Sequence, residues 1–222
     1  MEAVSQEKMR EIKETVTQKY GIPRDVMIEQ AGFQVASLVR KKFSEGLKIA
    51  VICGRDENGA SGFVAARRLL SWGYNIEVYT PFNRERLSQT AYTKLQNLED
   101  MNQEVEMMDF PTANAYVDAL THHSENSLAG DVAEAVGKME KWSADTVSVD
   151  APSGINADTG EGHKPCVRPD YTVTLGLPKK GLSRENSGKL FLADTGIPIC
   201  AVEENNVDAP DFKSSSLIDI SN

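Results

Sequence analysis

The sequence has little of what several large classes of protein require. Its 222 residues include three cysteines, Cys53, Cys166 and Cys200, which lack the paired spacing of a zinc site. Free thiols are typical of a reducing compartment, so we expect a cytoplasmic protein. No apolar run approaches the roughly 18–20 residues of a membrane span, and the first residues lack the apolar core of a signal peptide. We therefore expect no membrane association.

Basic charge is also scarce. The chain has 24 Lys and Arg against 33 Asp and Glu, which gives a formal net charge of −9. Nucleic-acid-binding surfaces usually carry an excess of Lys and Arg, so we expect no nucleic-acid partner. The hydrophobic content of 40% is ordinary for a globular protein, and the length suits one α/β domain.

Hydrophobic periodicity predicts helices and strands that alternate along the chain. The expected helices cover residues 5–19, 24–43, 62–72, 88–100 and 130–142. The expected strands cover residues 47–53, 74–79, 105–108, 146–149, 171–175 and 189–192, and residues 115–120 are ambiguous. This alternation predicts βαβ units and a parallel sheet behind a helical N-terminal segment. Residues 203–222 are polar and acidic, and we expect a loosely held tail.

Two strands end in segments suited to a ligand site. Asp150 directly follows an apolar strand, and a proline, Ser153 and a glycine come next. A glycine-rich turn, residues 54–62, follows another strand. In open α/β sheets ligands bind at the carboxyl ends of strands, and the helix N-terminus after such a turn favours anions. The alternatives are an ordinary strand-to-helix turn and an aspartate that bonds its own turn amides.

Further polar residues could complete such a site. The side chains of Asn58, Asp118 and Ser153 form an oxygen-rich set that suits a hard cation, unless Asp118 only caps the next helix. Lys179 follows a strand and could meet a phosphate as a point charge, the alternative being a solvated lysine. His122 and His123 are adjacent and are either site residues or exposed loop histidines.

Taken together, these segments resemble the YjeF N-terminal domain, the NAD(P)HX epimerase family. The resemblance extends from about residue 5 to residue 198 and includes M-I-E-Q-A-G, the glycine-rich turn, V-D-A and V-D-A-P-S-G with D-T-G behind it. The last two motifs are L-P-K-K-G-L and A-D-T-G-I-P, so six motifs occur in the family's order. We expect one domain over residues 1–202, followed by the tail at 203–222.

The resemblance implies a three-layer α/β/α Rossmann-like sandwich, often a homodimer, with a mostly parallel sheet. It implies interconversion of the R and S epimers of hydrated NADH and NADPH, which supplies the S form to a partner dehydratase. It also implies a potassium ion on Asn58, Asp118 and Ser153, with Asp150 as the substrate-contacting and catalytic aspartate. The expected substrate-binding residues are Glu57, Asn58, Gly59, Ala60, Ser61, His122, His123, Asp150 and Lys179.

The sequence departs from the family in its cofactor loop. Glu57, Ala60 and Ser61 replace an asparagine, a glycine and an aspartate, and residues 121–127 replace a glycine-rich segment. A Cβ at Ala60 is expected to limit backbone approach to a phosphate, and the charge of Glu57 is expected to repel an anion. Two hypotheses follow: an NAD(P)HX epimerase, or a non-catalytic module that keeps the fold and binds a nucleotide or dimerises.

Overall fold

The computed structural model describes residues 1–124, 126–141 and 144–221. Within these residues the strands form an eight-stranded sheet in the order β3-β2-β1-β4-β5-β6-β7-β8. All neighbouring strands are parallel except β7 and β8. The strands are β1 (Lys48–Cys53), β2 (Asn75–Tyr79), β3 (Val105–Glu106), β4 (Ala115–Ala119), β5 (Asp145–Val149), β6 (Tyr171–Leu175), β7 (Lys189–Ala193) and β8 (Leu217–Asp219).

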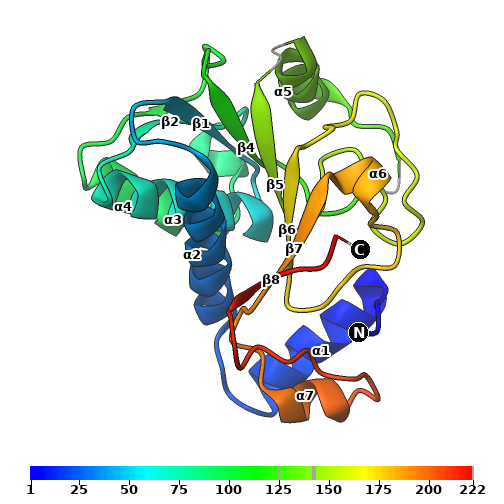
Figure 1. Ribbon diagram of the computed structural model, residues 1–222. Coiled ribbons are helices and arrows are strands. Elements are labelled where there is room, and N and C mark those ends of the chain that lie inside the picture. Colours follow the sequence, from blue (N-terminus) through cyan, green and yellow to red (C-terminus); the bar gives the residue numbers. More distant parts are fainter. Residues whose placement is uncertain (125, 142–143, 222) are drawn as a thin grey trace.

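Helices cover both faces of the sheet, as Figure 1 shows. Helices α2, α3 and α4 pack on one face, α5 packs on the other, and α1 and α7 lie together beside the β6–β8 half. The helices are α1 (Gln6–Gln18), α2 (Arg24–Lys42), α3 (Glu57–Ser71), α4 (Gln89–Glu99), α5 (Gly130–Lys141), α6 (Arg184–Ser187) and α7 (Ile199–Glu203), with a 3-10 turn η1 (Arg84–Arg86). This arrangement confirms the expected α/β fold. None of the described helices is long and apolar enough to cross a membrane.

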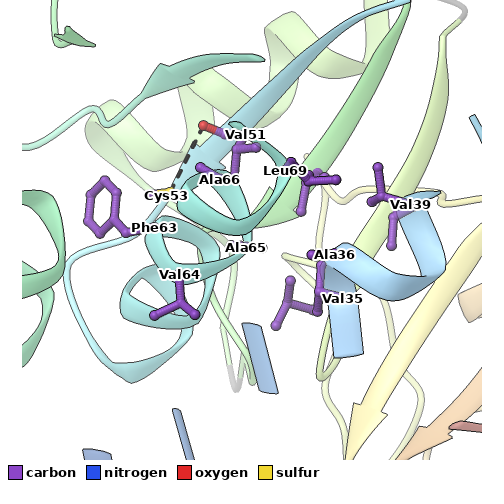
Figure 2. Close-up of a cluster of buried hydrophobic side chains, with 14 of the residues drawn as sticks. Val35, Ala36, Val39, Val51, Cys53, Phe63, Val64, Ala65, Ala66 and Leu69 are labelled. Carbon is purple, nitrogen blue, oxygen red and sulfur yellow. Dashed lines mark hydrogen bonds between the residues drawn. The ribbon is translucent and has the colours of Figure 1, made fainter. Parts of the chain in front are cut away.

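The central strand β1 is buried on both faces, which explains its unbroken apolar sequence. Val51 and Cys53 point into the cluster beneath α2 and α3, while Ala50 and Ile52 face α5. Figure 2 shows Val51 near Ala66 and Leu69 of α3, in the same cluster as Val35 and Val39 of α2. Successive side chains of β1 point to opposite faces of the sheet, so this one strand packs against both helical layers.

The strand order reverses between β1 and β4. From β1 the chain continues outward to β2 and β3, then returns to place β4 on the other side of β1. Beyond the carboxyl ends of these two strands, the backbone N–H of Gly54 donates to the carbonyl of Ala119 at 2.9 Å. Ligands of open α/β sheets bind at such a reversal, so the topology alone marks this end of β1 and β4 as the site.

Most of the glycine-rich segment, from residue 57 onward, is helix rather than turn, which corrects the expected helix start at residue 62. Helix α3 begins at Glu57, so Gly59 and Gly62 belong to its first turns. A Cβ on Gly59 would lie 1.8 Å from the carbonyl oxygen of Gly54, so this glycine serves close packing of the helix on the strand end. Glycine counts in sequence do not distinguish this requirement from a positive φ, which explains the error.

The C-terminal segment is more ordered than its composition suggests. Residues of β8 pair with β7 in antiparallel register, Leu192 opposite Ile218, and Leu217 is buried. This strand could not be predicted from the polar composition of residues 203–222. It is short and lies at the edge of the sheet, where only Leu217 of its residues is buried. The ambiguous segment at 115–120 contains β4, and the expected end of helix 130–142 lies at residue 142, outside the described residues.

The N-terminus is held by the far end of the sequence. Val4 donates its N–H to the carbonyl of Pro178 at 2.9 Å and accepts from the N–H of Lys180 at 3.1 Å. Met9 and Ile12 of α1 pack in one small cluster with Leu177. Helix α1 is thereby placed across the loop that follows β6.

A pair of glycine substitutions tests the close packing of α3. Gly59→Ala should lower the free energy of unfolding by about 1–3 kcal/mol or more, because its methyl group meets the backbone of Gly54. Gly137→Ala is the control, since a Cβ there meets nothing within 4 Å and alanine favours a helix by about 0.5–1 kcal/mol. Urea denaturation measures both. Equal effects of the two substitutions would contradict the packing argument.

Candidate functional site

A cleft lies beyond the carboxyl ends of the central strands. Met27, Ile28, Ala31 and Leu175 form an apolar wall, and the polar wall includes Asn58 and Asp150. The remaining lining residues are Lys13, Arg24, Glu57, Ser61, His122 and Thr195. An outer hollow adjoins the cleft and shares Lys13, Arg24, Glu57 and His122 with it. An apolar wall opposite a few polar groups is typical of a small-molecule site.

Asp150 is fixed at the floor of this cleft. It follows β5 with a φ of 63°, a left-handed conformation that a non-glycine residue seldom adopts and that is often found at functional sites. Its Oδ1 accepts from the N–H of Leu175 at 3.0 Å and from Nζ of Lys179 at 2.9 Å. Its Oδ2 has no hydrogen-bond partner among the described residues. One carboxylate oxygen is therefore anchored and the other is available to a ligand.

Lys179 lies beneath Asp150 rather than on the cleft wall. Its side chain is fully buried, and Nζ also donates to the carbonyls of Leu175 and Leu177 at 2.9 Å each. An ammonium has three protons, so its donors are used within the protein. Burial acts to raise the pKa of Asp150, but the charges of Lys179 and Lys13 outweigh it, and the net pKa is lowered. Asp150 is therefore ionised at neutral pH.

A second carboxylate, Asp118, is wholly buried in β4. Its Oδ2 accepts from Ser148 Oγ at 2.8 Å and from the N–H of Ser153 at 2.9 Å. Its Oδ1 accepts from Ser153 Oγ at 2.6 Å and from the N–H of Leu120 at 3.3 Å. Burial raises the pKa of Asp118 against these hydrogen bonds. No ion pair with a described residue compensates its charge.

Two of the three expected cation ligands, Asn58 and Ser153, contact the backbone of one residue, Thr121, and the third, Asp118, is joined to it through Ser153. Asn58 Nδ2 donates to the carbonyl of Thr121 at 3.0 Å, and the N–H of Thr121 donates to Ser153 Oγ at 3.0 Å. Ser153 in turn bonds Asp118. In the described part of the chain, no cluster of three or more His, Cys, Asp and Glu side chains could hold a metal. The group contains a single carboxylate, and Asn58 presents its amide nitrogen to the Thr121 carbonyl.

The altered loop residues have environments that the sequence did not reveal. Oε1 of Glu57 lies 2.8 Å from Nη1 of Arg24, and Oε2 lies 3.7 Å from Nζ of Lys13. The expected repulsion of an anion by Glu57 is therefore offset by two cations. Ala60 is buried in the hydrophobic core, so its Cβ points away from the cleft, whereas Ser61 lines the cleft and donates to the carbonyl of Glu57 at 3.0 Å.

The adjacent histidines take different positions. His122 lines both the cleft and the outer hollow. Desolvation by the surrounding protein lowers the pKa of His122, although the residue is exposed and the charge of Asp150 acts in the opposite direction. His123 lines only the outer hollow, where its Nδ1 accepts from the N–H of Ala157 at 3.2 Å. Of the two, His122 is the one that a ligand beside Asp150 would meet.

Several cleft residues were missed in the sequence. Lys13 and Arg24 belong to α1 and α2, and Thr195 follows β7, so none lies in a strand-end motif with Asp150. Their apolar neighbours Met27 and Ile28 fit the hydrophobic stripe of a helix, a pattern that indicates core packing rather than a ligand site. Two family motifs gave a signal: M-I-E-Q-A-G, which contains Met27 and Ile28, and A-D-T-G-I-P, which contains Thr195.

Known proteins of this fold support these assignments of fold and family. The sequence pattern described as "YjeF-related protein N-terminus" matches residues 24–181. The NAD(P)H-hydrate epimerase of Dehalogenimonas lykanthroporepellens is 34% identical over 197 residues, which cover 86% of this chain and 80% of that protein. The crystal structure of the yeast protein ynu0 superposes with a TM-score of 0.85 over 99% of this chain, at 24% sequence identity.

The chain belongs to the family of the YjeF-related protein N-terminus, which confirms the resemblance seen in the sequence. The bifunctional NAD(P)H-hydrate repair enzyme Nnr of Moorella thermoacetica is 31% identical over 217 residues. The match covers 89% of this chain but 41% of that enzyme, and 39% of the one from Thermofilum pendens. This chain thus spans about two fifths of the length of its bifunctional relatives.

The buried ion pair predicts a large difference between two neighbouring lysines. Lys179→Met should lower the free energy of unfolding by about 3–5 kcal/mol, because it leaves the carboxylate of Asp150 buried and unpaired. Lys180→Met should change it by less than about 0.5 kcal/mol, since Lys180 is exposed. Denaturant titration at neutral pH measures both.

The stability difference between Lys179→Met and wild type should also depend on pH. The lowered pKa of Asp150 contributes stability above its unfolded pKa, and this contribution is lost as pH falls through the folded pKa. The gap between Lys179→Met and wild type should therefore narrow in acid, where Asp150 is protonated. A gap that is constant from neutral pH into acid would show that lost packing, not lost pairing, explains the destabilisation.

Proposed function

We propose that this protein interconverts the R and S epimers of hydrated NADH and NADPH. The observation that carries the proposal is the geometry of Asp150, an ionised carboxylate with one oxygen anchored by Lys179 and the other facing the cleft. Family membership supports the reaction class, and relatives that carry the epimerase name, at 27–34% identity, match most of this chain.

The chemistry requires a base next to the hydroxyl-bearing ring carbon, which is also bonded to the ring nitrogen. Removal of the hydroxyl proton by Asp150 lets the carbon–nitrogen bond break, giving an aldehyde, and the nitrogen takes the proton back from the carboxyl group. Rotation about the adjacent carbon–carbon bond presents the other face of the aldehyde, and closure by the reverse steps gives the other epimer. Asp150 ends as it began, ionised, which agrees with its lowered pKa.

The cleft fits this reaction beyond the carboxylate. The apolar wall of Met27, Ile28, Ala31 and Leu175 can pack against the nicotinamide ring, and it excludes water from the face opposite Asp150. The departures from the family at residues 57 and 60 are weaker evidence for a non-catalytic module than the sequence suggested. Ala60 faces the core rather than the cleft, and Glu57 is paired with two cations. We therefore favour the enzyme over the binding module.

Asp150→Asn tests the catalytic role. Purified wild type given the R epimer should accelerate formation of S, and Asp150→Asn should lower kcat by about 100-fold or more, because the amide cannot act as the base. Asp145→Asn is a matched control, since Asp145 is exposed at the other end of the same strand. Chromatographic separation of the epimers over time measures the rates. A wild-type rate equal to the spontaneous one, with ligand binding retained, would favour the non-catalytic module.

We also propose that Asn58, Asp118 and Ser153 hold a potassium ion near the cleft. The residue types fit, because each of the three carries a side-chain oxygen and only one is a carboxylate, whereas calcium sites usually gather several carboxylates. The wholly buried and uncompensated Asp118 gives a reason for a cation. When bound, the ion would supply a positive charge that favours the ionised form of Asp118.

Potassium should therefore raise the melting temperature more than lithium at equal ionic strength. The pKa of Asp118 is raised in the folded protein, so in the absence of the ion a proton competes for its carboxylate. The advantage of potassium should grow as pH rises through that pKa and should largely vanish in Asp118→Asn. Thermal unfolding in the two salts at several pH values measures it. Equal melting temperatures throughout would indicate that the three residues only brace the loops.

The wider setting is proposed on the same basis. The relatives from Moorella thermoacetica and Thermofilum pendens are bifunctional NAD(P)H-hydrate repair enzymes, so we infer that the function of this chain is coupled to an NAD(P)HX dehydratase activity that consumes the S epimer. We also propose that the protein is a cytoplasmic homodimer and that residues 1–202 form the functional domain.

A further inference from the structure

Three helices bring charged side chains to the mouth of the cleft. Lys13 comes from α1, Arg24 is the first residue of α2, and Glu57 is the first residue of α3. We propose that Lys13 and Arg24, held beside each other by Glu57, bind the phosphate group that is attached to the nicotinamide ribose. This inference rests on the proposed function, because it places the nicotinamide ring of that substrate beside Asp150.

The cluster carries one positive charge in excess. Glu57 bonds Arg24 at 2.8 Å, while Lys13 Nζ lies 3.7 Å from Oε2, beyond hydrogen-bond distance. No described residue accepts a hydrogen bond from Nζ of Lys13. This ammonium is about one quarter exposed and therefore points three available donors at the boundary between the cleft and the outer hollow.

The backbone next to this cluster also favours an anion. The N-terminus of α3 carries the positive end of a 15-residue helix, and within the described structure no side chain caps its first turn. Asn58, in that turn, is 4% exposed and lines the cleft, and its Oδ1 has no partner among the described residues. This oxygen is not among the enclosed side-chain atoms that lack a partner, so it remains accessible from the cleft and can accept from a ligand hydroxyl group, such as that of a ribose.

The position along the cleft identifies which phosphate is bound. The apolar wall and Asp150 belong to the inner cleft only, whereas Lys13, Arg24 and Glu57 line both the cleft and the outer hollow. A ring held against Asp150 therefore directs its ribose and the attached phosphate through this boundary. The remainder of a dinucleotide would extend into the outer hollow.

Two ligands that differ by this one phosphate test the inference. Nicotinamide mononucleotide carries the group and nicotinamide riboside lacks it, and both can be titrated by calorimetry without turnover. Wild type should bind the mononucleotide at least about tenfold more tightly, the effect of one charge-assisted hydrogen bond. Lys13→Gln and Arg24→Gln should each remove most of this preference and change the affinity for the riboside less than about twofold.

Matched variants separate binding from folding. Lys13→Arg should keep most of the preference, and Lys8→Gln, on the same helix but paired with Glu11, should keep all of it. Melting temperatures of all variants show whether α1 is intact. A preference that survives both Lys13→Gln and Arg24→Gln, or an equal loss of affinity for the two ligands, would overturn the inference.

Epimerase assays separate this inference from the proposed function. If wild type converts the epimers while Lys13→Gln retains the KM of the hydrated mononucleotide, the phosphate assignment fails and the function stands. If wild type shows no conversion while the mononucleotide preference depends on Lys13, the function fails and the phosphate site stands.

Discussion

The buried pair of Asp150 and Lys179 is the interaction on which the site depends. It joins the turn after β5 to the loop after β6, and it holds Asp150 in a left-handed conformation that few residues adopt. Removing two charges from water is costly unless their remaining hydrogen bonds are satisfied, and here the carbonyls of Leu175 and Leu177 satisfy the lysine. The pair therefore fixes both the position and the charge of the carboxylate.

The two carboxylates at neighbouring strand ends have opposite environments. Asp150 lies next to a cation, which outweighs burial and lowers its pKa, whereas Asp118 has only neutral hydrogen-bond donors, and burial raises its pKa. Environments that shift the pKa values of two neighbouring carboxyl groups in opposite directions are typical of functional sites. In this arrangement one carboxylate faces the cleft and is the base of the proposed reaction, and the other, behind Ser153, is a ligand of the proposed potassium site.

Much of this could be predicted from the sequence, because strand ends in a parallel sheet must meet at one edge. The Asp150 turn and the convergence of Asn58, Asp118 and Ser153 follow from that rule together with the family motifs. The partners of Glu57 could not be predicted, since Lys13 and Arg24 come from helices whose packing no local pattern specifies. The burial of Lys179 was missed because a strand-end lysine looks the same in sequence whether its ammonium faces a ligand or the core.

The docking of the N-terminal segment has a consequence for biosynthesis. Val4 is held by residues 178 and 180, and Met9 and Ile12 pack against Leu177. During synthesis, the apolar side chains of α1 therefore stay exposed to solvent until residues 177–180 have left the ribosome and can pack against them. The cleft gains Lys13 only at that point, so a nascent chain that ends before residue 178 lacks β7, β8 and a finished site. Contacts so distant in sequence form slowly.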